Sequence, residues 1–518
     1  MYDDHVSRPR TALAPAAALL GLAAALGASP ARAEDFLQFP ADGTESLGRG
    51  AAWVARASTP WAVRANPAAI VTQATSVYAG SHLVFNETCF TRSGPGTTLT
   101  TGLTYPKTPT CTESTPTPLP SLGAVVRLGP SLAVGYLVAP PNSYGSVEFP
   151  DTVEVTNSFG YAQQIPSPQR YMLLEQKGIL LDHVFAVAWE PIRDLRLGAG
   201  FIWGMGQLEV RQATMSLVTP CAADGTCAPE DPNGDIIATI HTADWFTPGV
   251  VVGAHWSPVP VLDVGLAVRA QQDIQGRIDL QTQASYYGTR GVNPNPTVTE
   301  SRDIGEGLGR FRLEHPLNAR VGARYHAPRG QKPPVEGGAT VRDPLADDVF
   351  DIGLDFEWTQ TSEHERVSVR FPAQPKIVVQ GAGSEVPQNN DVELRLPRDT
   401  FGVRLGGDWV VLPAQLAVRA GAWYESDAQD PAYLNVTQLA TARLGLSVGA
   451  TYRIGPVDLD AAYAHVGFED ADNGGNGKLL VVAGEVVTTP PFRSPYAING
   501  GRASQEAHLV SLGATARF

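Results

Sequence analysis

The C-terminal half of the chain alternates apolar and polar residues with a period of two. In one stretch the alternate positions are all apolar: Leu416, Val418, Ala420, Ala422 and Tyr424. Arg419 falls between them. Because successive side chains of a β-strand point to opposite faces, this period places the apolar residues on one face and the charge on the other. The pattern predicts strands whose two faces meet different surroundings.

The same alternation, followed along the whole chain, predicts fourteen strands. They lie at 75–86, 121–128, 132–139, 179–190, 194–209, 240–257, 261–283, 310–326, 348–361, 400–411, 414–425, 439–454, 457–468 and 507–518. Several of these segments are longer than the ~9–11 residues that a tilted strand needs to cross a bilayer. We therefore expect some strands to continue beyond the membrane.

The connections between these strands are alternately short and long. Tight turns rich in proline or glycine lie at 129–131, 191–193, 258–260, 412–413 and 455–456. Long connections lie at 87–120, 140–178, 210–239, 284–309, 362–399, 426–438 and 469–506. Outer-membrane barrels have short periplasmic turns and longer extracellular loops in this order. The connection at 327–347 breaks the rule, because it should be a short turn and is not.

A sheet of this kind has to close on itself in lipid. An open edge would leave backbone N–H and C=O groups unpaired where water cannot reach them. A soluble β-sandwich also alternates, but it would not account for an export signal or for a last strand that ends in the aromatic residue Phe518. The sequence therefore predicts an all-β fold, a transmembrane antiparallel β-barrel of fourteen strands.

Residues 1–33 have the features of a cleavable signal peptide. Arg8 and Arg10 precede a core rich in Ala and Leu, and the segment 31–33 offers small residues at a cleavage site. A membrane anchor is the alternative, but the apolar run is short for one. Cleavage would leave a mature chain that begins at Glu34. Together with the strand pattern, this signal indicates the bacterial outer membrane.

Charge and cysteine content limit the partners of the chain. A formal net charge of -14 makes it a poor partner for nucleic acid. In an oxidising compartment, its four cysteines favour the two disulfides Cys89–Cys111 and Cys221–Cys227, each within one long connection. Free or differently paired thiols are the alternative. No CxxC or His-x3-His spacing accompanies these cysteines, so no metal site is expected.

Residues 34–74 contain no clear strand but are rich in apolar and aromatic side chains. Phe36, Leu37 and Phe39 stand at the beginning of the segment, and two tryptophans follow. A disordered leader would be more polar than this. Because the segment is attached to the first strand of a wide barrel, we expect it to fold back into the lumen as a plug, ahead of the barrel domain at 75–518.

Two short motifs of this segment resemble the hatch of a known family. Gly48-Arg49-Gly50-Ala51 is followed by Asn66-Pro67-Ala68. Together they are similar to the hatch signature of the FadL family of outer-membrane channels, which includes long-chain fatty-acid transporters and TodX-like channels for aromatic hydrocarbons. The resemblance extends from Glu34 to Phe518. It implies a monomeric fourteen-strand barrel that is closed by an N-terminal hatch. The terminal Phe518 is similar to the signal that the β-barrel assembly machinery reads.

The resemblance also implies a route for the substrate. A hydrophobic molecule would be captured outside, beyond the lipopolysaccharide layer, would enter a lumen pocket, and would leave sideways into the membrane through a gap in the wall. Pro140-Pro141 is a candidate for that gap, because proline cannot donate to a β-ladder; alternatively, these prolines begin the second extracellular loop. Phe36, Leu37 and Phe39 could reach the lumen pocket, or could serve in ordinary hatch packing.

Strand parity points several arginines into the lumen: Arg196, Arg320, Arg324, Arg404, Arg419 and Arg443. The carboxylate of a fatty acid would need such a cation beside an apolar pocket. On this ground Arg404, Arg419 and Arg443 are candidates for the substrate pathway. The alternative is that the arginines pair with inward acids and hold the barrel interior together, the acids being Asp263, Asp351, Asp355 and Glu357.

The leading hypothesis is therefore a passive channel for hydrophobic small molecules, without a cofactor and without catalytic activity. The alternatives are a water-filled porin for polar solutes, an outer-membrane lipase and an adhesin. The stretch 445–449 matches the G-x-S-x-G motif of hydrolases, but it lies within a predicted strand and not at a strand-to-helix turn. The sequence leaves open whether the ligand is a fatty acid, an alkane or an aromatic hydrocarbon.

Overall fold

The computed structural model of the chain describes most of the expected barrel. The described residues are 42–113, 115–141, 146–215, 229–232, 235–284, 302–303, 309–313, 315–330, 339–362, 366–370, 376–378, 385–387, 390–393, 396–480 and 496–518. The expected signal peptide at 1–33 lies outside these residues, and so do Phe36, Leu37, Phe39, Cys221 and Cys227.

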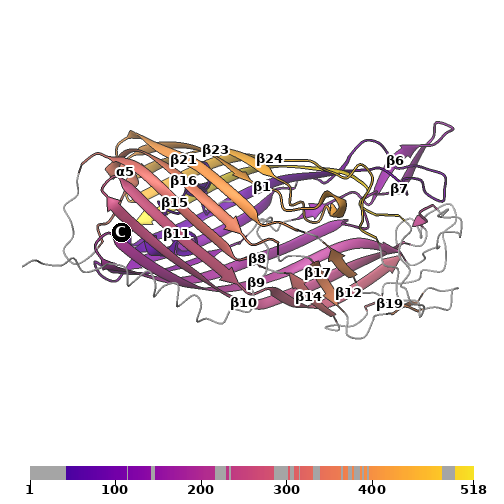
Figure 1. Ribbon diagram of the computed structural model, residues 1–518, viewed down its shortest axis with the longest axis horizontal. Helices are drawn as coiled ribbons and strands as arrows, with labels where there is room; N and C mark the ends of the chain where they lie inside the picture. The colour runs from indigo at the N-terminus through magenta and orange to yellow at the C-terminus, as the bar shows by residue number, and fades with distance from the viewer. Residues whose placement is uncertain are drawn as a thin grey trace, which may run out of the picture.

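Fourteen antiparallel strands form a closed barrel, which confirms the predicted fold class (Figure 1). The barrel strands are β1 (Ser76–Arg92), β3 (Thr117–Arg127), β4 (Leu132–Ala139), β8 (Glu175–Ile192), β9 (Leu195–Met215), β10 (Asp235–Val259), β11 (Leu262–Gln271), β15 (Asn318–Pro328), β16 (Asp348–Thr359), β21 (Thr400–Leu412), β22 (Leu416–Glu425), β23 (Arg443–Ile454), β24 (Val457–Phe468) and β26 (Gly501–Arg517). The last strand closes the ring by pairing with the first along its whole length, from Ser76 opposite Arg517 to Arg92 opposite Gly501.

One side of the wall continues beyond the closed ring. After short breaks, four further strands prolong β11, β15, β16 and β21: these are β12 (Ile274–Ala284), β14 (Gly309–Leu313), β17 (Arg366–Arg370) and β20 (Asn390–Glu393). They pair with one another in that order, and β12 also pairs with β10. The extension occupies the lower right of Figure 1, at the end that carries the long connections, which we call the loop end. The opposite end, with the short connections, is the turn end.

The remaining elements are short. The small strands are β2 (Thr110–Cys111), β5 (Val147–Glu148), β6 (Thr152–Thr156), β7 (Ala162–Pro166), β13 (Arg302–Asp303), β18 (Lys376–Val378), β19 (Glu385–Pro387) and β25 (Ala471–Asp472). The helical segments are α2 (Thr44–Gly48), α3 (Ala62–Ala65), η1 (Pro67–Thr72), α5 (Pro344–Asp347) and η3 (Pro431–Tyr433). Within the described residues, every helix is too short to traverse a membrane.

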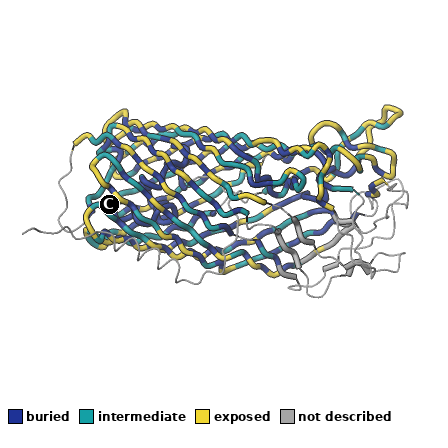
Figure 2. The backbone as a smooth tube through the Cα atoms, in the orientation of Figure 1, coloured by how far each residue is buried: buried dark blue, intermediate teal, exposed yellow. Residues whose placement is uncertain are grey.

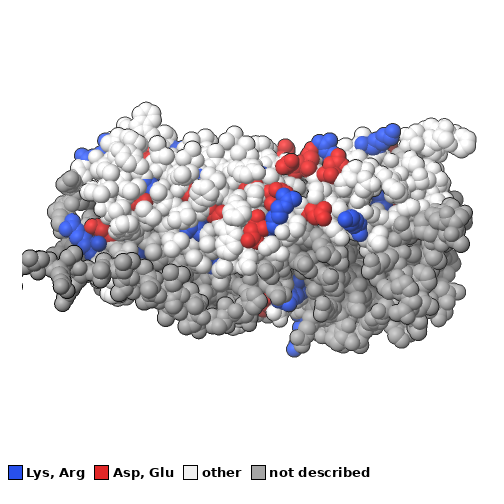
Figure 3. All heavy atoms as spheres, viewed as in Figure 1, with Lys and Arg blue, Asp and Glu red and all other residues white. Residues whose placement is uncertain are grey.

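The two faces of the wall differ as the alternation predicts. On β23 the outward side chains Leu444, Leu446 and Val448 are 53%, 57% and 56% exposed, whereas the inward Ser447 is 5% exposed. Exposed and buried residues alternate in this way around the ring (Figure 2). In Figure 3 the wall is largely free of charge from the turn end, at left, to a group of acidic and basic side chains midway along the molecule. A barrel wall that is apolar on its outer face is typical of a barrel surrounded by lipid.

Residues 42–74 lie inside the barrel. From Asp42 to Gln73 every residue except Arg56 is buried. The short helices of this segment contact opposite parts of the wall, α2 against β23 and β24, and η1 against β8, β9 and β10. We call this segment the hatch. Its position agrees with the expected plug.

Wall glycines allow the hatch backbone to approach closely. A Cβ atom at Gly421 of β22 would overlap backbone atoms of Arg49 and Gly50, and one at Gly198 of β9 would overlap Pro67 and Ala68. Gly50 itself has a φ of 65°, which glycine adopts without steric cost. The small residues on the inner face of the wall therefore mark the places where the hatch is seated.

Several strand bounds differ from the predicted ones. β1 runs to Arg92 and β26 begins at Gly501, because the two strands pair with each other over this whole length. Cys89 and Cys111 therefore lie in the strands β1 and β2 and not in a loop, and they form a disulfide there. The single strand predicted at 261–283 is in fact two strands, with Gln272 and Asp273 between them. Alternation does not reveal such a break, because the period of two continues across it.

The long connection at 327–347 crosses the turn end of the barrel. Residues 339–347 of this connection, which we call the strap, are hydrogen-bonded to the hatch: the N–H of Arg342 donates to the carbonyl of Thr72 at 2.8 Å. Asp343 of the strap pairs with Arg453 at 2.5 Å. Two further hydrogen bonds join the strap to the turns at Pro130 and Ala414. The connection is long because it spans the mouth of the barrel from one side to the other.

We expect Gly421→Val to destabilise the folded protein by about 1–3 kcal/mol, because its side chain would overpack the backbone of the hatch. Gly467→Val in β24 is the matched control, since a Cβ at Gly467 meets nothing within 4 Å. The measurement is the temperature at which the folded form, which migrates faster in a detergent gel, converts to the unfolded form. Equal transition temperatures for the two variants would contradict the close seating of the hatch.

Candidate functional site

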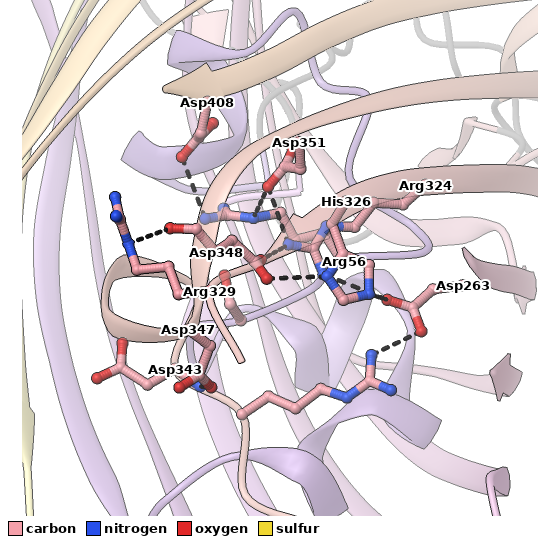
Figure 4. A network of polar contacts seen from close by, with 12 residues as sticks. Arg56, Asp263, Arg324, His326, Arg329, Asp343, Asp347, Asp348, Asp351 and Asp408 are labelled. Atoms are coloured by element: carbon pink, nitrogen blue, oxygen red, sulfur yellow. Dashed lines mark hydrogen bonds and ion pairs between the residues drawn. The ribbon is translucent and has the colours of Figure 1, made fainter. Parts of the chain in front are cut away.

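The half of the lumen toward the turn end is filled by the hatch and by ion pairs that hold it. Arg49 of the hatch contacts Asp351 of β16 at 2.5 Å and Asp408 of β21 at 3.6 Å. Arg56 of the hatch contacts the same two carboxylates, at 3.0 and 3.1 Å. Asp351 also pairs with Arg324 of β15 at 3.0 Å (Figure 4). Buried charges are stable only when paired in this manner.

Backbone groups of the hatch are also bound by the wall. One carboxylate oxygen of Asp355 accepts hydrogen bonds from the N–H groups of Trp53 and Val54, at 2.6 and 2.8 Å. The amide of Asn66 donates to the carbonyls of Val54 and Ala254, at 2.8 and 3.1 Å. These contacts join the hatch to β10 and β16.

The motif residues of the hatch each have a structural place. Asn66 caps η1 by accepting a hydrogen bond from the N–H of Ala68, and Pro67 occupies the first position of that helix. Gly50 donates its N–H to the hydroxyl of Ser447 at 2.9 Å. Gly48 packs against Gly449 of β23. The motif therefore fixes how the hatch meets the wall, and Ser447 of the G-x-S-x-G stretch serves as one of its anchors.

Arg404, Arg419 and Arg443 are buried and paired with acids. Arg404 contacts Glu425 at 2.8 Å and also Glu357, and Arg443 contacts the same Glu425. Arg419 lies 3.3 Å from Asp408 and 3.5 Å from Asp460. These contacts agree with the alternative in which inward arginines hold the barrel interior together.

Toward the loop end the lumen becomes apolar. Loop residues fold inward there against β1, β9 and β10 and form an upper apolar cluster, made of Phe90, Phe149, Tyr171, Met172, Leu173, Leu174, Ala213, Ile237, Leu434, Val436, Leu439, Ala471, Leu479, Ile498 and Ala503. A second cluster lines the inner face of the extended wall, made of Leu180, Leu208, Ala238, Ile240, Ile274, Ile278, Phe311 and Leu313. Sequence reasoning missed both clusters, because they join residues from segments that are far apart in the sequence.

A third apolar cluster connects this region with the hatch. It contains Leu47 of α2 and inward side chains of β1, β22, β24 and β26: Val84, Trp423, Ala462, Ala464, Val466, Ala507 and Leu509. Leu119 of β3 packs against it. Apolar clusters therefore occur both at the loop end of the lumen and beside α2 of the hatch.

The wall has a discontinuity where β4 ends at Ala139. β4 pairs with β3 up to Val138 and with β8 up to Ala139. The next pairing on that side of β8 joins β5 to residues 175–176. Residues 177–181 of β8 and 117–121 of β3 thus have no ladder partner on the facing side among the described residues. The buried Leu180 belongs to this stretch and connects it with the apolar inner wall.

Prolines lie on the β3 edge of this discontinuity and directly after the end of β4. Pro140 and Pro141 follow β4, as the sequence analysis pointed out, and Pro118 and Pro120 stand in the unpaired part of β3. A proline lacks the N–H that would extend the ladder. The carbonyl of Pro141 accepts a hydrogen bond from Arg64 of the hatch at 3.3 Å. Pro118 and Pro120 were not among the predicted site residues, although alternating prolines within a strand were a visible signal.

A buried polar network ties the loops together at the loop end. Glu230 contacts Arg92 at 2.9 Å and Arg170 at 2.5 Å, and it accepts a hydrogen bond from Tyr105 at 2.6 Å. Arg170 also pairs with Asp235 at 2.6 Å. Burial raises the pKa of Glu230, but the two arginines outweigh burial and hold this pKa below its ordinary value.

We expect Glu230→Gln to lower the free energy of unfolding by about 3 kcal/mol at neutral pH, because it leaves two buried arginines short of a carboxylate. The ionised Glu230 contributes fully above its unfolded pKa of 4.5, and the contribution is lost as the pH falls through the lower folded pKa. Thermal unfolding of both proteins at neutral and acidic pH measures this. Midpoints that do not converge in acid would contradict the assignment.

Comparisons with known proteins match the chain at the level of structure. Neither a protein-family model nor a curated protein matches its sequence. The fold is similar to that of a FadL homologue from Pseudomonas aeruginosa, with a TM-score of 0.63 and 18% identity, over 93% of this chain and 99% of that one. The toluene transporter TodX from Pseudomonas putida gives a TM-score of 0.57 and 12% identity, over 93% and 99%.

The toluene transporter TbuX from Ralstonia pickettii gives a TM-score of 0.51 and 14% identity, over 93% of this chain and 99% of that one. Identities this low carry the fold and not the activity. In each case the match extends over nearly the whole of both chains. The chain therefore has the fold of the FadL and TodX family of outer-membrane channels.

Proposed function

We propose that the protein is an outer-membrane channel for the passive uptake of hydrophobic small molecules. The observation that carries this proposal is the set of apolar clusters in the loop half of a lumen whose turn half is occupied by the hatch. A hydrophobic ligand gains by burying its surface there, at ~25 cal/mol per Å². The similarity in fold to a FadL homologue and to toluene transporters supports the same activity.

A water-filled porin fits the interior less well. The hatch is buried throughout, and ion pairs with Asp351 and Asp408 hold it against the wall. The strap closes the turn end beneath it through the hydrogen bond between Arg342 and Thr72. Both features oppose an open axial path for polar solutes, and they also oppose axial exit of a hydrophobic ligand.

We infer that the ligand leaves sideways, through the wall discontinuity between β3 and β8. The prolines that border this discontinuity keep its edges from pairing, and Leu180 faces the lumen beside it. An apolar molecule moving from the apolar clusters to this edge stays out of water along its route. The contact between Arg64 and the carbonyl of Pro141 places the hatch at the inner side of the same edge.

The remaining expectations complete the proposal. The chain is exported by a signal peptide at 1–33, its hatch domain begins at Glu34, and it works as a monomer among lipopolysaccharide. Phe518, which the assembly machinery would read, is 79% exposed at the end of β26. Its N–H donates to the carbonyl of Thr75 at 2.8 Å, so the terminal residue remains tied to the barrel wall.

The lateral route is tested with a large side chain at the edge of the discontinuity. Ala139 is fully buried and Val138, beside it, faces outward. We expect Ala139→Trp to lower the initial rate of uptake of radiolabelled toluene about tenfold, while Val138→Trp leaves the rate unchanged, because only the first narrows the inner side of the opening. Heat-modifiable gel migration verifies that both variants fold. Equal uptake by the two folded variants would contradict lateral release.

The plug is tested by deletion of residues 34–69. All wall strands pair outside this segment, so we expect the barrel to fold without it. Water would then enter the turn half and solvate the acids that the hatch arginines had neutralised. Single-channel conductance in planar bilayers should rise well above that of the intact protein. An unchanged low conductance of the folded deletion variant would refute the role of the hatch as the plug.

A further inference from the structure

The buried charges of the interior favour acids over bases. Among the described residues, fifteen Asp and Glu residues are buried, against ten Arg residues, and no Lys is buried. The ten arginines are Arg49, Arg64, Arg92, Arg170, Arg196, Arg320, Arg324, Arg404, Arg419 and Arg443. Each of them lies within ion-pair distance of at least one carboxylate of the chain itself. The positive charge of the lumen is thus already neutralised.

The arginines are also paired with carboxylates where the apolar and polar halves of the lumen meet. A small cavity of about 30 Å³ lies there, lined by Leu439 of the upper apolar cluster and by charged side chains. Its three arginines are Arg320, Arg404 and Arg443. This is the place where an amphipathic ligand, with its chain among the apolar residues, would present its head group.

Three carboxylates neutralise these three arginines. Arg320 contacts Asp42 of the hatch at 2.5 Å and Glu357 at 3.1 Å. Glu357 also contacts Arg404, and Glu425 contacts both Arg404 and Arg443. A ligand carboxylate arriving at this junction would have to displace one of these acids, or stay buried beside it as a second negative charge. Both alternatives cost free energy that an uncharged ligand does not lose.

A second group of buried arginines, at the loop end, is also paired with acids of the chain. At the loop end, Arg92 and Arg170 contact Glu230, and Arg170 also contacts Asp235. This pairing lies beside the upper apolar cluster, to which Tyr171 belongs. At both polar sites that border the apolar clusters, an anionic head group would therefore meet arginines that are already paired with carboxylates.

We infer that this channel selects uncharged hydrophobic molecules and discriminates against carboxylates such as ionised fatty acids. The inference rests on the proposed function and names its substrate class. Discrimination arises because each buried arginine of the described residues is already paired with an acid of the chain. Apolar recognition, which needs no charged partner, is unaffected.

The test compares two ligands that differ only in the head group, decan-1-ol and decanoate. Binding to the detergent-solubilised full chain at pH 7 is followed by quenching of tryptophan fluorescence. We expect the alcohol to bind about tenfold or more tightly than the carboxylate. Equal affinity for the two ligands would overturn the inference and leave the channel function in place. Binding of neither ligand would count against the proposed function itself.

The variant Glu425→Gln assigns the discrimination to the junction. It removes the acid shared by Arg404 and Arg443, so decanoate should gain about tenfold in affinity while decan-1-ol stays as before. Asp470→Asn is the matched control, because it removes one acid that pairs with Arg502 on the exterior. The partition of each ligand into detergent is the same in all three proteins and cancels in the comparison. An unchanged preference in Glu425→Gln would overturn the assignment.

A pH titration of the unmodified protein serves if the variant does not fold. Decanoate loses its charge as the pH falls through the usual range of carboxylic acids, about 4 to 5. Its affinity should then approach that of decan-1-ol, whose head group does not titrate. A decanoate affinity that stayed constant or fell across this range would contradict selection against the charge.

Discussion

Arg49 and Arg56 carry two positive charges into the interior of the barrel, where little water can compensate them. Asp351 and Asp408 on the wall form ion pairs with these arginines, and the buried carboxylates are neutralised by the arginines in turn. Neither set is stable alone in a closed interior. The position of the hatch therefore follows from the strands on which those acids stand.

This mutual neutralisation divides the lumen into two halves. The turn half has charge on both the hatch and the wall and is occupied by the hatch. The loop half has no such segment within it, and inward-folded loops fill it with apolar side chains such as Met172 and Leu434. A ligand can exchange places with apolar contacts more easily than with ion pairs, because the contacts are individually weak. The half that opens to the outside is thus the half suited to a hydrophobic guest.

The wall discontinuity and the strap favour a sideways exit from the lumen over an axial one. The strap and the hatch together obstruct the barrel axis, whereas the wall lacks described ladder pairing beside the buried Leu180. Pro118 and Pro120 stand on the β3 edge of the discontinuity, and Pro140 and Pro141 directly follow β4. None of them can supply an N–H donor that would extend the ladder. The gap in strand pairing therefore follows from the positions of the prolines in the sequence, without a conformational change.

The sequence by itself determined the barrel, because a period of two over fourteen segments leaves few other ways to bury every backbone group in lipid. It also located the hatch and, through the parity of the strand positions, the inward arginines. It did not decide whether Arg404, Arg419 and Arg443 await a ligand or are already paired. Their partners Glu357, Glu425, Asp408 and Asp460 stand on other strands, and only the register between strands places them within reach. The apolar clusters and the strap likewise depend on contacts between distant segments, which no local pattern records. The sequence by itself shows which side chains can line the lumen. Only the strand register and the position of the hatch decide which of the lumen's charges remain available to a ligand.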